Sequence, residues 1–159
     1  MLRRSLLLFG FLMSFSVLMA QRTKPTTQKP PVVQKFKAPK VKTSWGKYSD
    51  SSTVSIEEAV VLLSSPLVIT DEKNTSYGIS SYQFLYRKKG VTEDEQTGKV
   101  TPVTSIVTKS LRSTPLSETL TNFIIEQLRR GEEFLFYDVL VKDGQGHIFF
   151  APSLKVKIK

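Results

Sequence analysis

Apolar and polar positions change their spacing several times from residue 56 onward. Apolar residues recur at helical spacing over 56–64 and 115–130. Period-two alternation or short apolar runs predict strands at 67–70, 79–88, 100–111, 134–141, 148–150 and 154–158. This order predicts an α+β fold, in which an antiparallel sheet of five to six strands is packed by the 115–130 helix, with the short 56–64 helix at an end or edge.

The first helix has clear boundaries. Ser55 and Glu58 stand at capping-box spacing, where each side chain can bond to the backbone amide of the other. Pro66 disfavours further helix just beyond residue 64.

The second helix is predicted from a longer apolar stripe. Thr114 is the expected cap and Pro115 the first helical residue, which needs no amide donor. Gly131 is the expected stop. The residues of the stripe are Leu116, Leu120, Phe123, Ile124 and Leu128.

The strand at 134–141 is apolar on both faces, which predicts a central position in the sheet. Asp138 interrupts it. One interpretation is a buried acid with a raised pKa. The other is a carboxylate turned toward a backbone amide, a sheet edge or a basic side chain. We favour the second, because the sequence shows no second acid, histidine or metal ligand at a useful spacing.

Four aromatic residues are candidates for a ligand-stacking surface. Tyr77 lies at the start of the segment that leads into the 79–88 strand. Tyr82 and Tyr86 share one face of the 79–88 strand, and Trp45 is the only tryptophan. Aromatic side chains favour strands for packing reasons, so a half-buried sheet face and a domain edge are the favoured interpretations. The alternative is a set of surface aromatics that stack on sugar rings.

The most polar stretch of the domain runs from residue 88 to 99. It predicts a solvated loop, and loops often carry function. We therefore name it a possible partner-binding loop. Its acids lack the alternate spacing of a calcium loop, so we expect no metal there. The candidate residues are Lys89, Glu93, Asp94, Glu95 and Lys99.

The amino terminus resembles an export signal. Arg3 and Arg4 precede an apolar run that ends at Ala20, a pattern typical of a signal peptide. We expect cleavage after residue 20, with an uncleaved anchor as the alternative. The predicted organisation is a signal peptide at 1–20, a basic, disordered Pro/Lys-rich linker at 21–49, and a single domain at 50–159. The expected location is periplasmic or secreted.

The net charge of +9 belongs to the linker and not to the domain. Residues 21–49 hold eight basic residues and no acid, whereas the remainder from Asp50 onward has 13 basic and 14 acidic residues. A nucleic-acid partner is therefore not expected. The linker is either a spacer or a basic strap for peptidoglycan or an anionic envelope surface.

The sequence lacks the usual constellations of an enzyme. It has no cysteine, and His147 is its only histidine. Neither a GxSxG elbow nor a phosphate-binding glycine pattern is present. We therefore expect no enzymatic activity, cofactor or metal.

One family resemblance emerges from the last third of the chain. Gln127-Leu128-x-x-Gly131, Glu133-x-x-Phe136-Tyr137-Asp138-Val139 and Asp143-Gly144-x-Gly146 precede an alternating terminal strand. This pattern, over about residues 114–159, resembles the C-terminal domain of the GldM/PorM family, envelope proteins of gliding motility and type IX secretion in Bacteroidota. The resemblance implies a small β-rich envelope domain without catalytic residues. Because the chain is far shorter, we expect a shared domain type and not the motor-linked role.

These observations predict an exported interaction or structural module of the bacterial cell envelope. Its partner would be another envelope protein, bound through a sheet edge or the 89–99 loop. The alternative is a glycan- or peptidoglycan-binding module that uses the aromatic side chains named above.

Overall fold

The computed structural model describes residues 36–49 and 51–159. The predicted signal peptide and linker residues 21–35 lie outside the described residues. The expected cleavage and the expected disorder of that segment therefore stay predictions.

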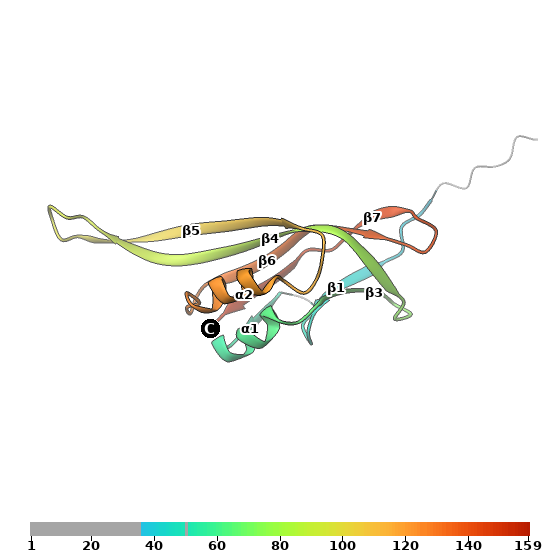
Figure 1. The fold of residues 1–159 in the computed structure, drawn as a ribbon, viewed down its shortest axis with the longest axis horizontal. Helices are drawn as coiled ribbons and strands as arrows, with labels where there is room; N and C mark the ends of the chain where they lie inside the picture. The colour runs from blue at the N-terminus through green and yellow to red at the C-terminus, as the bar shows by residue number, and fades with distance from the viewer. Residues whose placement is uncertain (1–35, 50) are drawn as a thin grey trace, which may run out of the picture. The chain divides into compact units, whose positions relative to one another are not determined.

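The described chain folds as α+β, with eight strands and two helices in one sheet-based unit (Figure 1). The principal strand order is β1-β3-β4-β6-β8-β2, with β5 paired to β4 and β7 paired to β6. The elements are β1 (Val41–Trp45), β2 (Ser52–Val54), α1 (Ile56–Leu63), β3 (Leu67–Asp71), β4 (Ser76–Glu93), β5 (Val100–Leu111), α2 (Glu118–Ile125), β6 (Glu133–Lys142), β7 (Ile148–Ala151) and β8 (Leu154–Ile158).

The prediction of five to six strands is wrong, because β1 and β2 were not recognised. β1 lies inside the predicted linker, so a boundary at residue 49 is also wrong for the folded part. Its Thr43 and Trp45 are each only 1% exposed, and β1 pairs with β3. β2 runs parallel to β8, so the sheet is not wholly antiparallel. The surrounding lysines and prolines concealed the short alternating pattern of β1.

Helix α1 confirms the predicted capping box. The Ser55 hydroxyl accepts from the Glu58 amide, and the Glu58 carboxylate accepts from the Ser55 amide, both at 3.2 Å. The helix buries Ala59, Leu62 and Leu63 against the sheet. Val61, on the other side, is 68% exposed.

Helix α2 is shorter than the predicted 115–130. It begins after Ser117, whose hydroxyl accepts from the Leu120 amide at 3.4 Å, and ends at Ile125. The predicted cap Thr114 instead accepts a 2.6 Å bond from the Leu67 amide, which ties the approach to α2 to β3. Leu128 is buried in the connection beyond the helix, whereas Phe123 is 42% exposed. The apolar spacing therefore extended beyond the helix itself.

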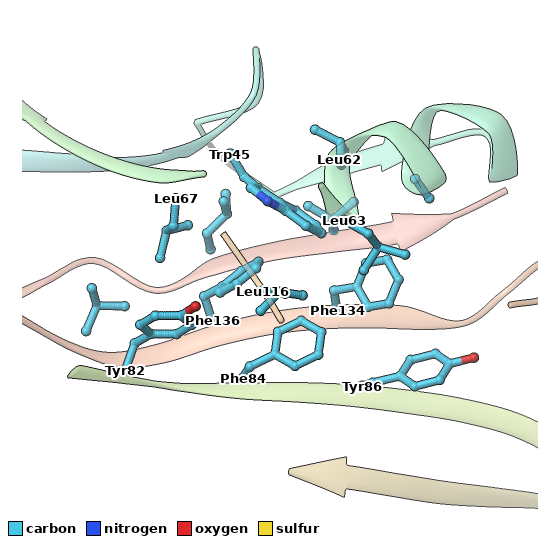
Figure 2. Packing of buried hydrophobic residues seen from close by; sticks show 14 of the residues in the cluster. Trp45, Leu62, Leu63, Leu67, Tyr82, Phe84, Tyr86, Leu116, Phe134 and Phe136 are labelled. Carbon is cyan, nitrogen blue, oxygen red and sulfur yellow. The ribbon is translucent and has the colours of Figure 1, made fainter. Parts of the chain in front are cut away.

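The core lies between the sheet and the two helices. Trp45 packs edge-on against Phe134 and Phe136 of β6, with ring centroids 5.7 and 4.8 Å away (Figure 2). Its indole nitrogen donates to the Ser65 carbonyl at 2.9 Å. The β4 row Tyr82, Phe84 and Tyr86 completes this aromatic layer.

Strand β6 occupies the predicted central position. It pairs with β4 on one side, and with β7 and β8 in succession on the other. Asp138 is exposed and has φ = +49°, next to a shift in the β4–β6 register. It interrupts the apolar run because it occupies an irregular position in the strand, a bulge that turns the carboxylate outward. The interpretation of Asp138 as a buried acid is wrong.

Candidate interaction surface

A two-stranded arm extends from the sheet. The β4–β6 pairing ends at Arg87, opposite Glu133, whereas the β4–β5 pairing continues to Glu93, opposite Val100. Residues 88–105 therefore form a hairpin whose only strand partners, within the described part of the chain, are each other. We call this segment the hairpin arm; Figure 1 shows it extending past β6 and α2. The predicted loop at 88–99 is thus strand as far as Glu93, with a short connection from Asp94 to Lys99.

The predicted partner-binding residues all lie exposed on this arm. Lys89 and Glu93 are on β4, and Asp94, Glu95 and Lys99 are in the connection. Asp94 shapes the turn: its carboxylate accepts from the Gln96 and Thr97 amides at 3.0 and 2.8 Å. The bonds from Thr97, followed by the bond from Gln96, hold the pKa of Asp94 below its ordinary value.

Apolar side chains accompany these charges on the arm. Val91 and Val100 are 67% and 56% exposed, and Val103 is 38% exposed. Val91 lies opposite Pro102 and Val100 lies opposite Glu93, so the two valines share one face of the hairpin. The register places them beyond the end of β6, where they cannot reach the core. Apolar groups held away from a core are typical of contact surfaces.

A buried acid anchors the base of the arm. Glu132 is fully buried, and its carboxylate accepts from the Lys89 amide at 3.1 Å and from the Arg129 amide at 2.9 Å. It also accepts a short hydrogen bond from the Tyr86 hydroxyl. Burial, followed by this bond to Glu132, raises the pKa of Tyr86 well above its ordinary value. Glu132 therefore joins β4 to the α2–β6 connection at the point where the arm leaves the sheet.

Sequence reasoning missed Glu132, although a signal was present. Phe134 and Phe136 face the core, and alternation along a strand places Glu132 on that same face. The Tyr82 to Tyr86 row predicts a hydroxyl nearby on the neighbouring strand. The adjacent Glu133, on the other face, is ion-paired with Arg87 and, at 3.0 Å, with Lys155.

A groove separates β5 from α2. It has a volume of about 500 Å³ and is lined mainly by apolar side chains. Val107, Lys109 and Leu111 contribute from β5. Leu120 and Phe123 contribute from α2, together with Ser117 and Thr119.

The interpretation as surface aromatics is wrong for three of the four candidates. Tyr77 is half-buried: its hydroxyl donates to the Asp71 carboxylate at 3.1 Å, and its ring packs edge-on against Phe149. Trp45 and Tyr82 are each 1% exposed and Tyr86 is 0% exposed, so none presents a ring face to a sugar (Figure 2). Packing against the β6 phenylalanines accounts for the burial of these residues. The favoured interpretation, that these side chains pack in the sheet and at its edge, agrees with this placement.

The solitary histidine lies in the β6–β7 turn. His147 Nδ1 is 2.8 Å from the Asp143 carboxylate, and its ring stacks on Phe36 with centroids 4.2 Å apart. Partial burial alone would raise the pKa of Asp143, but the hydrogen bonds from His147 and Gln145 lower it overall. Asp143 also accepts from the Gln145 and His147 amides, both at 2.9 Å, so the pair shapes the turn.

Within residues 36–49 and 51–159, no three His, Cys, Asp or Glu side chains come together in a way that could hold a metal ion. The helices of the same residues include none that is both long and apolar enough to span a membrane.

No protein-family model matches the chain, and no curated protein shows significant similarity to it.

Proposed function

We propose that the protein is an exported, non-catalytic interaction module of the bacterial cell envelope, which binds another envelope protein through its hairpin arm. The observation that carries this proposal is the arm itself, with Val91 and Val100 exposed beside a charged tip. A hairpin with no third strand gains little stability from its own pairing. Glu132 nevertheless holds the base of the arm through the hydrogen bond from the Lys89 amide. An arm held in one position supports a role in binding.

The envelope location is supported by the leader and by the resemblance of residues 114–159 to the GldM/PorM C-terminal domain. Both are sequence arguments, and the type IX secretion or gliding context rests on the second alone. The peptidoglycan alternative through aromatic stacking has little support in this fold, because Trp45, Tyr82 and Tyr86 are in the core and the half-buried Tyr77 packs against Phe149.

The test is photo-cross-linking in native envelopes, with a photoreactive residue at Glu95 in the exposed tip. We expect one defined protein adduct, identified by mass spectrometry. Replacing residues 91–102 by Asn-Gly keeps the Gly90–Val103 pair as the new hairpin end and should abolish binding in a competition assay. The double variant Val91→Ser/Val100→Ser should weaken it.

Val61→Ser is the matched control, since Val61 is 68% exposed on α1, away from the arm. It should leave the adduct unchanged. A protein adduct that the arm-deleted chain competes for as well as the wild type does would contradict the proposal, as would the absence of any adduct.

A further inference from the structure

Among the described residues, no strand pairs with the outer edge of β5 along its whole length. β5 spans Val100–Leu111, and within the described residues its ladder partner is β4 alone. An unpaired edge offers a row of backbone donors and acceptors to another extended chain. This edge borders the apolar groove between β5 and α2.

The hairpin turn reveals which β5 residues offer their backbone groups to that edge. The Asp94 amide donates to the Lys99 carbonyl at 3.0 Å, so the backbone of Lys99 faces β4. Directions alternate along an antiparallel strand, and the register is unbroken, so odd-numbered β5 residues face β4. The even-numbered residues face the open edge. Pro102, which has no amide hydrogen, fits this series because its missing donor would point away from β4.

The strand therefore divides into a blocked part and an available part. Pro102 removes one edge donor near the tip. Beyond it, the edge-facing residues are Thr104, Ile106, Thr108 and Ser110, each with its own amide and carbonyl. This available part coincides with the groove, whose β5 residues begin at Val107.

The groove specifies the side chains of an incoming strand. Residues directly opposite one another in a sheet point to the same face. Residues paired with Val107 and Leu111 would enter the apolar groove beside Leu120 and Phe123. A residue paired with Lys109 would meet its ammonium group, which an acidic side chain complements. Residues between these would point to the other face, beside Ile106 and Thr108.

We propose that the β5 edge and the β5–α2 groove bind an extended segment of a partner protein with the pattern apolar–x–acidic–x–apolar, added to the sheet as a further strand. Backbone bonds to the even-numbered residues supply affinity, and the groove and Lys109 supply selectivity. This inference rests on the proposed function, for which it gives the chemistry of the partner segment at a surface separate from the arm tip.

The test uses the purified chain and a capped peptide, Ser-Thr-Val-Thr-Glu-Thr-Val-Thr-Ser, which reads the same in both directions. In nuclear magnetic resonance titrations we expect saturable shifts of the backbone amides over 104–111 and of the α2 side of the groove. The same peptide N-methylated at every residue from its first to its last threonine cannot donate to β5 in either strand direction and should not bind. A peptide with lysine in place of glutamate should bind about fivefold more weakly, as for exposed ion pairs.

Three protein variants make the assignment specific. Thr108→Pro removes an edge-facing amide between the groove-lining residues Val107 and Lys109. It should weaken peptide binding about tenfold, the effect of roughly one lost hydrogen bond. Val100→Pro removes an edge-facing amide outside the groove and should leave peptide binding unchanged. It is the matched control for peptide binding alone, because Val100 belongs to the arm. Lys109→Glu should reverse the preference, so that the lysine peptide binds better than the glutamate peptide. Thermal melts of each variant check that it is folded.

Equal binding of the N-methylated peptide, or no reversal by folded Lys109→Glu, would overturn the inference. So would self-association of the wild-type chain through this edge, shown by a dimer in sedimentation that Thr108→Pro dissociates. If no peptide binds the wild-type chain while the Glu95 adduct forms and persists in Thr108→Pro, the inference fails and the proposed function stands. If the peptide binds and no arm adduct forms, the edge site stands and the arm proposal fails.

Discussion

The Lys89 amide donates to the Glu132 carboxylate at 3.1 Å, although the two residues are 43 positions apart in the chain. Lys89 is where β4 has passed its last partner on β6, and Glu132 closes the connection after α2. Removal of this buried carboxylate would lower the stability of the fold, because two backbone amides and one phenol hydroxyl would remain buried without a hydrogen-bond acceptor.

Glu132→Ala should therefore destabilise the protein by roughly 3 kcal/mol, since it leaves the Lys89 and Arg129 amides and the Tyr86 hydroxyl without their acceptor. Urea denaturation measures this loss. Glu126→Ala is the control, because Glu126 is exposed at the end of α2 and should change stability by less than about 0.5 kcal/mol. Equal effects of the two substitutions would show that the buried carboxylate does not anchor the arm.

The lowered pKa of Glu58 predicts that the stability of the fold decreases at acid pH. A hydrogen bond from Lys47, followed by bonds from the Ser55 amide and the Tyr48 hydroxyl, lowers the pKa of Glu58 from 4.5 to about 2. A depressed carboxyl pKa stabilises the fold at pH values above 4.5, and this contribution is lost as the pH falls toward 2. The melting temperature of Glu58→Gln should lie below that of the wild type at pH 6, and the two should converge near pH 2. A constant difference across this range would contradict the assignment.

Trp45 should serve as a folding probe. It is the only tryptophan and is 1% exposed, so native fluorescence should resist acrylamide quenching and shift to the red on unfolding. Trp45→Ala should cost about 3–5 kcal/mol, as expected for a large buried aromatic residue. Phe36→Ala, at a residue that is 41% exposed, should cost much less. Efficient quenching of the native protein would show that Trp45 is on the surface.

Position 46 requires glycine because of its backbone conformation and because of the side chain packed against it. It has φ = +56°, and a Cβ atom there would lie 2.7 Å from Leu62 Cδ2. Gly46→Ala should therefore destabilise the fold by roughly 2 kcal/mol, from left-handed strain and crowding in the core. Gly144→Ala is the control, because a Cβ at Gly144 would meet no atom within 4 Å. Chemical denaturation of both variants distinguishes this requirement from a general loss of glycine.

Strong local signals predicted much of the fold. The capping box at Ser55 and Glu58 located α1, and the continuous apolar run around Phe136 identified the central strand. Both signals are local, because they depend on spacing within a single element. The predicted end of α2, at residue 130, was too late. Leu128 is apolar at helical spacing, but it packs from the connection after the helix.

Features that depend on residues far apart in the chain could not be predicted from the sequence. Strand β1 needs β3 as its neighbour, and nothing within Val41–Trp45 reveals that pairing. The arm was predicted as a loop, because residues 88–93 have a polar pattern that carries no burial signal. The sequence placed Glu132 only as a residue that leads into the 134–141 strand. Its role as a buried acceptor was not predicted, because its donors come from β4 and from the segment after α2.

The position of β8 sets an order of events during synthesis. Leu154–Ile158 lies between β6 and β2, and β8 is the only described strand paired with β2. Until these residues leave the ribosome, β2 has no partner and half of one β6 edge stays open. The sheet is therefore completed only after translation has passed residue 158.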